Sequence, residues 1–145
     1  KLQERMYWSP DGDSGLVMAR SAEKPNSITQ EIKNLEPGKL YTFRMMTCDY
    51  DDMSKKEKYA VRIELENVTM IPERTFTCFA PLPGFINPKT HKTRMNYHWY
   101  LFRAKGQSAR VTITDWKAND EPAGPVGQQL MFNFLQVHPY YPREE

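Results

Sequence analysis

The segment Tyr59–Glu66 has the sequence YAVRIELE, in which large apolar residues alternate with small or charged ones. Side chains of a β-strand point alternately to the two faces of its sheet, so this pattern predicts a strand with one buried face. Val111–Thr114, with the sequence VTIT, shows the same alternation. Strands of this kind are typical of antiparallel sheets that pack one face on a core and expose the other to water.

Further strands are expected on both sides of these two segments. Long apolar, aromatic and β-branched residues occupy both faces of three segments, which is typical of central strands: Leu40–Tyr50, Asn96–Ala104 and Leu130–Val137. Shorter strands are expected at Leu16–Arg20 and Arg74–Phe79. Turn-forming residues separate the strands at Pro10–Asp13, Glu36–Gly38, Lys105–Gln107 and Glu121–Pro125. Seven or eight short strands with regular turns predict an all-β antiparallel β-sandwich.

Two segments do not fit a regular strand pattern. Ile28, Ile32 and Leu35 follow Ser27 at the spacing i, i+4 and i+7, which marginally favours a short amphipathic helix over a strand. Ala80–Arg94 contains three prolines and a glycine, so we expect it to form the longest loop. Loops of that length in compact domains usually carry function or are disordered.

Composition limits the domain organisation and the class of protein. The 145 residues fit a single domain spanning 1–145. The 20 Lys and Arg against 18 Asp and Glu give a net charge of +2, without the clustered basic face of a nucleic-acid-binding protein. No run approaches the roughly 18 apolar residues of a membrane-spanning helix. The N-terminal Lys1–Arg5 is no signal peptide and begins abruptly, as an excised domain would. We expect a monomer.

The residues that usually carry catalysis are sparse. Cys48 and Cys78 are too few for a disulfide scaffold, and they either form one bridge or, the favoured interpretation, remain unbridged. No nucleophile elbow, zinc motif or phosphate-binding loop occurs. Asp49 and Asp52 are the best paired carboxylates, but they lie in a charged turn without apolar neighbours to raise a pKa. We therefore expect no enzymatic activity.

Aromatic residues are the most informative class, because four aromatic rings fall within Asn96–Phe102. Side chains on one strand divide into two faces: Tyr97, Trp99 and Leu101 on one, and His98, Tyr100 and Phe102 on the other. Only one face can point into the core, so large rings remain on the outer surface of a sheet. These rings are either covered by a loop or neighbouring domain, or form a stacking platform for a ligand with flat apolar faces, such as a sugar.

A possible calcium site lies near the N-terminus. Asp11 and Asp13 alternate with Gly12 and precede Ser14-Gly15, which resembles a small oxygen-rich calcium loop. An ordinary Asp-Gly turn is the competing interpretation. If calcium binds, Asp11 and Asp13 are its expected side-chain ligands.

Three segments resemble a known family of protein modules. Ser27–Phe43 resembles the Q-x-I-x-x-L-x-P-G-x-x-Y segment of carbohydrate-binding modules, the galactose-binding-like β-sandwiches attached to xylanases and glucanases. Tyr100–Ala104 with Val111–Trp116 is similar to the paired late strands of that family, and Gly127–Val137 to its closing strand. The resemblance implies a jelly-roll sandwich and a strand rather than a helix before Leu35. At Asn133 the family often has an Asp close to a structural calcium.

The resemblance also implies a function and a site. It implies a non-catalytic module that holds an attached glycoside hydrolase on polysaccharide outside the cell or in the periplasm. The family-like pairing directs Phe102 inward with Val111 and Ile113, and Tyr97 and Trp99 outward. The expected sugar-binding residues are Trp99, Tyr97, Phe85 and Arg94, with Tyr100 and His98 on the opposite face as the alternative.

Two other functions remain open. The first is a structural accessory domain whose outer aromatic residues pack on a neighbouring catalytic domain without binding sugar. The second is a small glycan-active enzyme that uses Asp49 and Asp52. The sugar itself is not determined by the sequence: Lys89, His91, Lys92 and Arg94 suit an anionic glycan, or form a solvated basic loop.

Overall fold

A computed structural model describes residues 15–52, 61–81 and 94–142. These ranges form eleven strands and one short 3-10 helix. The elements are β1 (Leu16–Ala19), β2 (Ser27–Ile32), β3 (Leu40–Asp49), β4 (Arg62–Glu66), β5 (Val68–Met70), η2 (Pro72–Arg74), β6 (Phe76–Pro81), β7 (Arg94–Ala104), β8 (Ala109–Thr114), β9 (Trp116–Ala118), β10 (Glu121–Pro122) and β11 (Gln129–Pro139). The prediction of an all-β protein is confirmed.

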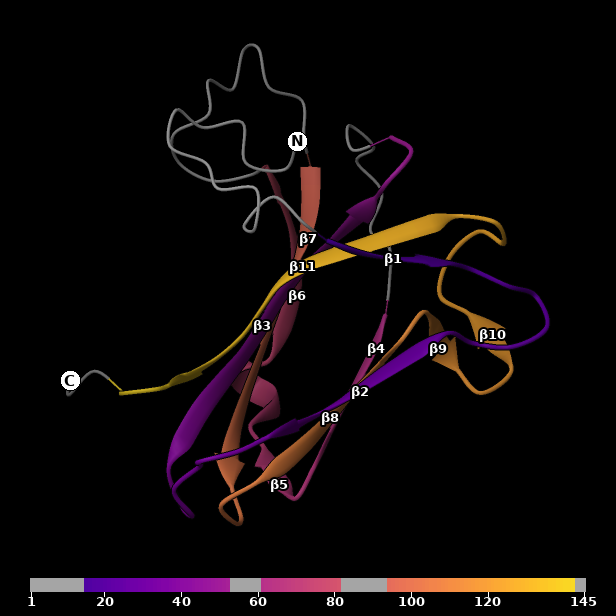
Figure 1. The fold of residues 1–145 in the computed structure, drawn as a ribbon. Helices are drawn as coiled ribbons and strands as arrows, with labels where there is room; N and C mark the ends of the chain where they lie inside the picture. The colour runs from indigo at the N-terminus through magenta and orange to yellow at the C-terminus, as the bar shows by residue number, and fades with distance from the viewer. Residues whose placement is uncertain (1–14, 53–60, 82–93, 143–145) are drawn as a thin grey trace.

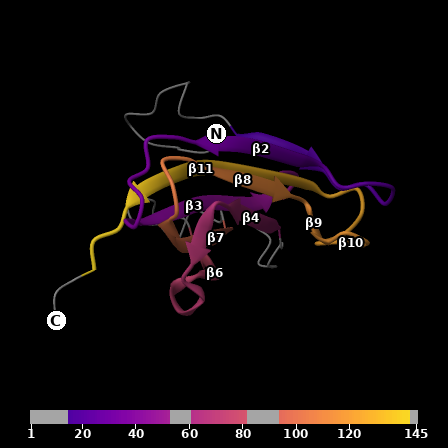
Figure 2. The ribbon, with the colours of Figure 1, turned by 90° about the horizontal axis from the view of Figure 1, so that it is seen from below.

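The strands form two main antiparallel sheets. The large sheet has the order β1-β11-β3-β7-β5, and β6 pairs with β7 along the same edge as β5 but nearer the start of β7 (Figure 1). The small sheet has the order β2-β8-β4. Figure 2 shows β2 and β8 along one side of the molecule, and β7 and β6 along the other. The short β9-β10 hairpin lies at one end. Because the two antiparallel sheets pack against each other, the fold is an antiparallel β-sandwich.

The core lies between the two sheets and follows from their registers. In the large sheet Tyr41 pairs with Phe102, and in the small sheet Ile113 pairs with both Ile28 and Ile63. Phe102 is fully buried and belongs to the same cluster as Ile113. Burial of each large apolar side chain contributes about 1.5–3 kcal/mol to folding, so this cluster holds the sheets together.

The segment containing Ile28 and Ile32 is the strand β2, so the strand implied by the resemblance is confirmed and the helix marginally favoured by the spacing is wrong. Residues four apart share one face of a helix, but they also share one face of a strand. Here Ile28 pairs with Ile113 and Ile32 with Ala109, so both isoleucines pack on the core from an edge of β8. The spacing of the isoleucines fits the periodicity of both a helix and a strand, and pairing with β8 makes the segment a strand.

The turn predicted at Glu36–Gly38 precedes β3. The N–H of Lys39 donates to the carbonyl of Glu36 at 3.1 Å, and Gly38 has a φ of 84°. Pro37 and Gly38 thus occupy the two central positions of a type II turn, the second of which needs a positive φ. A glycine adopts this φ without the steric cost that other residues carry.

A β-bulge interrupts β11. Its pairing with β3 runs from Leu130 to Asn133, which is opposite Met46, and resumes with Gln136 opposite Arg44. Three steps along β11 thus match two along β3, so β11 contains one extra residue, and Phe134 has a φ of 56°. The extra residue exchanges the faces of the strand beyond it. As a result, Phe132 before the bulge and Val137 after it both reach the core side.

Other segments differ from the sequence-based expectation in extent. The strand expected at Arg74–Phe79 begins instead at Phe76, because Pro72–Arg74 forms the short helix η2. Strands β5, β9 and β10, of two or three residues each, were not predicted. Residues 82–93, most of the expected loop, and the turn at Pro10–Asp13 lie outside the described residues. Across the described ranges, no helix is long and apolar enough to cross a membrane.

Candidate ligand-binding face

The two faces of β7 have different environments. Phe102 lies in the core with Val111 and Ile113, which places it on the inner side, as predicted. Alternation then directs Tyr97 and Trp99 to the outer side of the large sheet, where both side chains are partly exposed. The outer side of this sheet therefore carries two residues of the predicted stacking platform, Tyr97 and Trp99.

Three side chains form a row across the outer side of the large sheet. Trp99 of β7 pairs with Arg44 of β3 on one side and with Phe76 of β6 on the other. The Arg44 guanidinium carbon lies 4.3 Å from the centroid of the Trp99 ring. The Phe76 and Trp99 rings are stacked, with centroids 6.1 Å apart and an interplanar angle of 8°. We call Arg44, Trp99 and Phe76 the aromatic row.

A second row lies beside the aromatic row, two residues along each strand. Tyr97 pairs with Met46 of β3 and with Cys78 of β6, and all three side chains are partly buried. The Tyr97 and Trp99 rings are tilted by 37°, with centroids 6.4 Å apart. Aromatic rings and sulfur atoms thus continue the apolar surface beyond the aromatic row.

The exposure of these rings determines what they can contact. Phe76 is 49% exposed, and β6 pairs only with β7 among the described strands. Its outer ring face is therefore open to a ligand, whereas Trp99 lies between Arg44 and Phe76 and presents its edge. Sequence reasoning missed both Phe76 and Arg44. Each lies in an expected strand, but only the pairing of distant strands shows that they flank Trp99.

The alternative pair, Tyr100 and His98, lies on the inner side of β7. His98 is 2% exposed, and its Nε2 and Nδ1 atoms hydrogen-bond to the hydroxyls of Thr47 at 2.9 Å and Thr77 at 3.0 Å. Burial lowers the pKa of His98 to about 4. Burial also raises the pKa of Tyr100, which packs against the core. Neither environment resembles an open sugar-binding surface.

Several predicted site residues lie outside the described part of the molecule. These are Phe85, Asp11 and Asp13, together with the side chain of Arg94, so their roles stay predictions. The described ranges contain no group of three His, Cys, Asp or Glu side chains placed to hold a metal ion. At Asn133, Oδ1 accepts a hydrogen bond from the N–H of Phe134 at 2.7 Å. Calcium binding through Asp11 and Asp13 therefore also stays a prediction.

Asp49, the first carboxylate of the alternative catalytic pair, belongs to a buried polar cluster. Its Oδ1 accepts from the backbone N–H groups of Asp51 and Asp52, each at 3.0 Å. Its Oδ2 accepts from Gln128 Nε2 at 3.1 Å, and Gln128 Oε1 accepts from Arg20 Nε at 2.9 Å. These contacts use both oxygens of Asp49 to hold the end of β3 against the start of β11.

Both cysteines are free. Cys48 is buried on β3, where burial and then the charge of Asp49 raise its pKa to about 12. Cys78 lies on β6, and β7 separates the two strands. Two strand spacings are about 10 Å, which exceeds the roughly 7 Å between Cα atoms that a disulfide tolerates. The interpretation without a bridge is confirmed for this structure.

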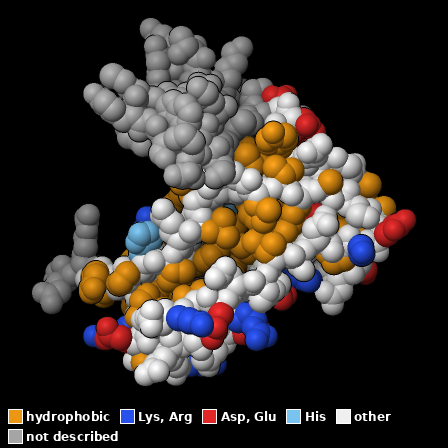
Figure 3. Space-filling model, viewed as in Figure 1, with side chains coloured by type: hydrophobic (Ala, Val, Ile, Leu, Met, Phe, Trp, Pro, Cys, Tyr) orange, Lys and Arg blue, Asp and Glu red, His pale blue; other side chains and the backbone are white. Residues whose placement is uncertain are grey.

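A cleft opens between the two sheets along β2 and the second half of β11. Its volume is about 440 Å³, and its apolar lining includes Ile28, Phe43, Val111 and Val137. Figure 3 looks toward this side and shows apolar side chains as a band between polar margins. The cleft is part of the sandwich core that remains uncovered, because β1 pairs with β11 only as far as Phe132.

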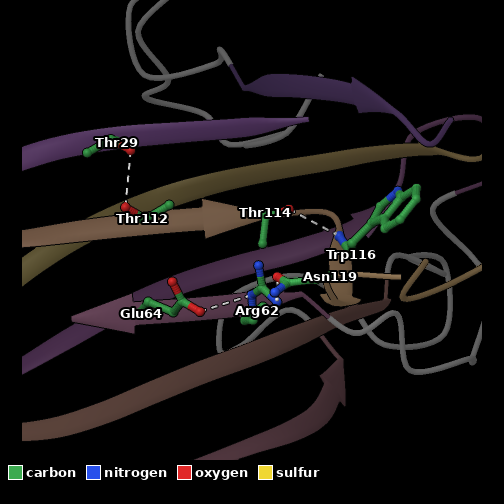
Figure 4. A network of polar contacts seen from close by, with 7 residues as sticks. All are labelled: Thr29, Arg62, Glu64, Thr112, Thr114, Trp116 and Asn119. Atoms are coloured by element: carbon green, nitrogen blue, oxygen red, sulfur yellow. Dashed lines mark hydrogen bonds and ion pairs between the residues drawn. The ribbon is translucent and has the colours of Figure 1, made fainter. Parts of the chain in front are cut away.

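The outer side of the small sheet is polar and hydrogen-bonded within itself (Figure 4). The hydroxyls of Thr29 and Thr112 lie 3.1 Å apart across β2 and β8. Arg62 contacts Glu64 at 3.1 Å and donates to Asn119 at 3.0 Å. Thr29, Thr112 and Glu64 thus find partners on the small sheet itself, and Arg62 also reaches Asn119 between β9 and β10.

Comparisons with protein-family models, with curated proteins and with solved structures found no match to this chain.

Proposed function

We propose that this chain is a non-catalytic carbohydrate-binding module that binds polysaccharide through the outer side of its large sheet. It would hold an attached glycoside hydrolase on its substrate, outside the cell or in the periplasm, by raising the local concentration of the enzyme. The galactose-binding-like jelly roll suggested by the sequence is part of this proposal. The observation that carries it is the aromatic row, with Phe76 49% exposed.

The chemistry of the aromatic row suits sugar rings. A pyranose has an apolar C–H face that packs on an aromatic ring, and hydroxyls that need polar partners. Phe76 offers an open ring face, and Tyr97 and Arg44 supply polar groups nearby. Aromatic side chains lose little conformational entropy on binding. Paired strands hold these rings more rigidly than a loop would.

Affinity electrophoresis in gels that contain neutral or acidic polysaccharides tests this function. We expect the protein to be retarded by at least one polysaccharide, and Phe76→Ala to migrate faster than the unmodified protein in that gel. Thr112→Ala, on the outer side of the small sheet, is the matched control and should behave as the unmodified protein. Each variant is first checked by its thermal melting curve.

Three results would overturn the proposal. If no polysaccharide retards the folded protein, the module does not bind glycans. If the isolated domain also self-associates and Phe76→Ala makes it monomeric, the outer side is a docking face for a neighbouring domain. Release of reducing sugars from a polysaccharide would instead indicate an enzyme, and Asp49→Asn with Asp52→Asn would then test the alternative carboxylates.

A further inference from the structure

Arg44 differs from the other arginines of the described part of the chain. Five further arginine side chains are described, and each donates a hydrogen bond or lies in an ion pair: Arg20, Arg62, Arg74, Arg103 and Arg110. Arg44 lies over Trp99 and has no hydrogen-bond or ion-pair partner among the described residues. Its Nε is buried without a hydrogen bond, as is the Nε of Arg62, so a ligand would bind the terminal N–H groups of the Arg44 guanidinium.

The position of Arg44 suits an acidic ligand group. The Trp99 ring holds the guanidinium carbon 4.3 Å from its centroid, and the N–H groups of a guanidinium lie around the edge of its plane. A planar guanidinium binds a carboxylate or a sulfate through paired, charge-assisted hydrogen bonds. Because Trp99 already orders the side chain, little further rotamer entropy is lost when such an anion binds.

The aromatic row also sets the length of the ligand. Arg44 and Phe76 lie on β3 and β6, which flank β7, so they are separated by two strand spacings, about 10 Å. A sugar ring on the outer face of Phe76 lies farther still from Arg44, so a ligand that reaches both needs at least two sugar rings. One ring can then pack on the open face of Phe76 while the acidic group of the neighbouring ring reaches Arg44.

We infer that the aromatic row selects acidic glycans, with Arg44 binding the anionic group of one sugar and Phe76 packing on the next. This inference rests on the proposed glycan-binding function and adds the class of sugar. The shared chemistry is a sugar-borne anion, which is either a uronic acid carboxylate or a sulfate ester. Arg44 is a specificity-determining residue that the sequence did not single out.

Isothermal titration calorimetry with matched ligands tests this inference. The ligands are oligomers of a polyuronate, the same oligomers with their carboxyl groups reduced to alcohols, and a sulfated galactan oligomer. We expect the charged form to bind about tenfold more tightly than the reduced form, as one charge-assisted hydrogen bond would give. Tighter binding of the polyuronate than of the sulfated oligomer identifies a carboxylate ligand, and the reverse identifies a sulfate.

Variants of Arg44 assign the preference to its guanidinium. Arg44→Gln should lower the affinity for the charged oligomer much more than that for the reduced oligomer, so that the difference between the two is lost. Arg44→Lys keeps the charge without the planar fork and should retain only part of the preference. Arg110→Gln is the matched control, because Arg110 is exposed on the outer side of the small sheet, and it should leave the preference unchanged.

The possible results separate the inference from the function on which it rests. Equal binding of the charged and reduced oligomers overturns the role of Arg44 but leaves glycan binding intact. Failure of the protein to bind any charged or neutral polysaccharide overturns both. If Arg44→Gln does not fold, the unmodified protein and Arg44→Lys still test the inference. Arg44→Lys that keeps the full preference for charged over reduced oligomers would contradict recognition through the planar guanidinium.

Discussion

The outer sides of the two sheets differ in the side chains that they present to water. On the small sheet, Thr29 contacts Thr112, and Arg62 contacts both Glu64 and Asn119. On the large sheet, aromatic rings and sulfur atoms form the surface, and Arg44 has no ion-pair or hydrogen-bond partner among the described residues. A face whose polar groups are matched internally gains little from a ligand. The outer side of the large sheet is therefore the one left for binding.

The difference also shows how much each face contributes to stability. Exposed ion pairs such as that of Arg110 and Glu66 contribute about 0–1 kcal/mol. Packed rings remove more apolar surface from water, but the outer rings are only partly covered. The clusters between the sheets should therefore contribute most of the stability, and a smaller buried cluster on the outer side of the large sheet, Cys48, Met95 and Met131, adds to it. One face of β7 packs in the core and the other belongs to the candidate binding face. Substitutions in β7 therefore separate effects on stability from effects on binding most clearly.

The largest effect is expected for the inner side of β7. Phe102 is fully buried against both sheets, so Phe102→Ala should lower the free energy of unfolding by about 3–5 kcal/mol. Trp99→Ala, three residues away on the outer side, should cost clearly less. Urea denaturation of both variants measures the difference. Equal losses would mean that the outer side is also core.

His98 gives the inner side of β7 a pH dependence. Burial lowers its pKa from 6.5 to about 4, so between these values the unfolded chain binds a proton that the folded protein excludes. The corresponding stability is fully present above pH 6.5 and is lost as the pH falls toward 4. The loss is about 3 kcal/mol when the pKa difference is converted to free energy.

Urea denaturation between pH 7 and pH 4 measures this dependence. His98→Gln should flatten the decline, whereas the exposed His138→Gln should not alter it. An unchanged decline in His98→Gln would assign the pH dependence to other groups, such as the buried carboxylates.

On the outer side, the expected effect is on binding rather than on stability. Trp99→Ala should keep the fold but weaken glycan binding by about 2 kcal/mol, the lower bound for a binding hot spot. That corresponds to a roughly thirtyfold loss of affinity. Phe76→Ala should weaken binding at least as much, because its ring face is the open one. Calorimetry measures both, and a collapse of the melting temperature in Trp99→Ala would contradict the assignment.

The smallest effects are expected on the outer side of the small sheet. Thr112→Ala and Arg110→Gln should each change the free energy of unfolding by no more than about 0.5 kcal/mol, as surface substitutions usually do. Neither should change glycan affinity. A loss of binding in either variant would move the binding face from the large sheet to the small one.

The sequence predicted the fold where side-chain period and strand length agreed. Val111–Thr114 lies within β8 as expected, since its alternation has only one interpretation. At Ile28 and Ile32 the spacing marginally favoured a helix, but pairing with β8 makes the segment a strand. Strands β5, β9 and β10 have two or three residues, too few to carry a period.

The candidate site was predictable only within one strand. The orientation of Tyr97 and Trp99 followed from alternation and from the inward Phe102. Arg44 comes from β3, which is not consecutive with β7, and Phe76 comes from β6, which precedes β7 in the chain but is not joined to it by a short turn. Pattern reasoning identifies which side chains share a strand face, but contacts between strands that no short turn connects require the register itself.

The bulge in β11 makes the length of that strand a determinant of the fold. One inserted residue between Asn133 and Gln136 sets which later side chains face the core. Replacing Phe134 changes one position. Deleting it would remove the extra residue and leave a regular ladder, in which Val137 still lies opposite Phe43 and faces the core. Homologous chains should therefore have either four residues between Phe132 and Val137, with the bulge, or three, without it.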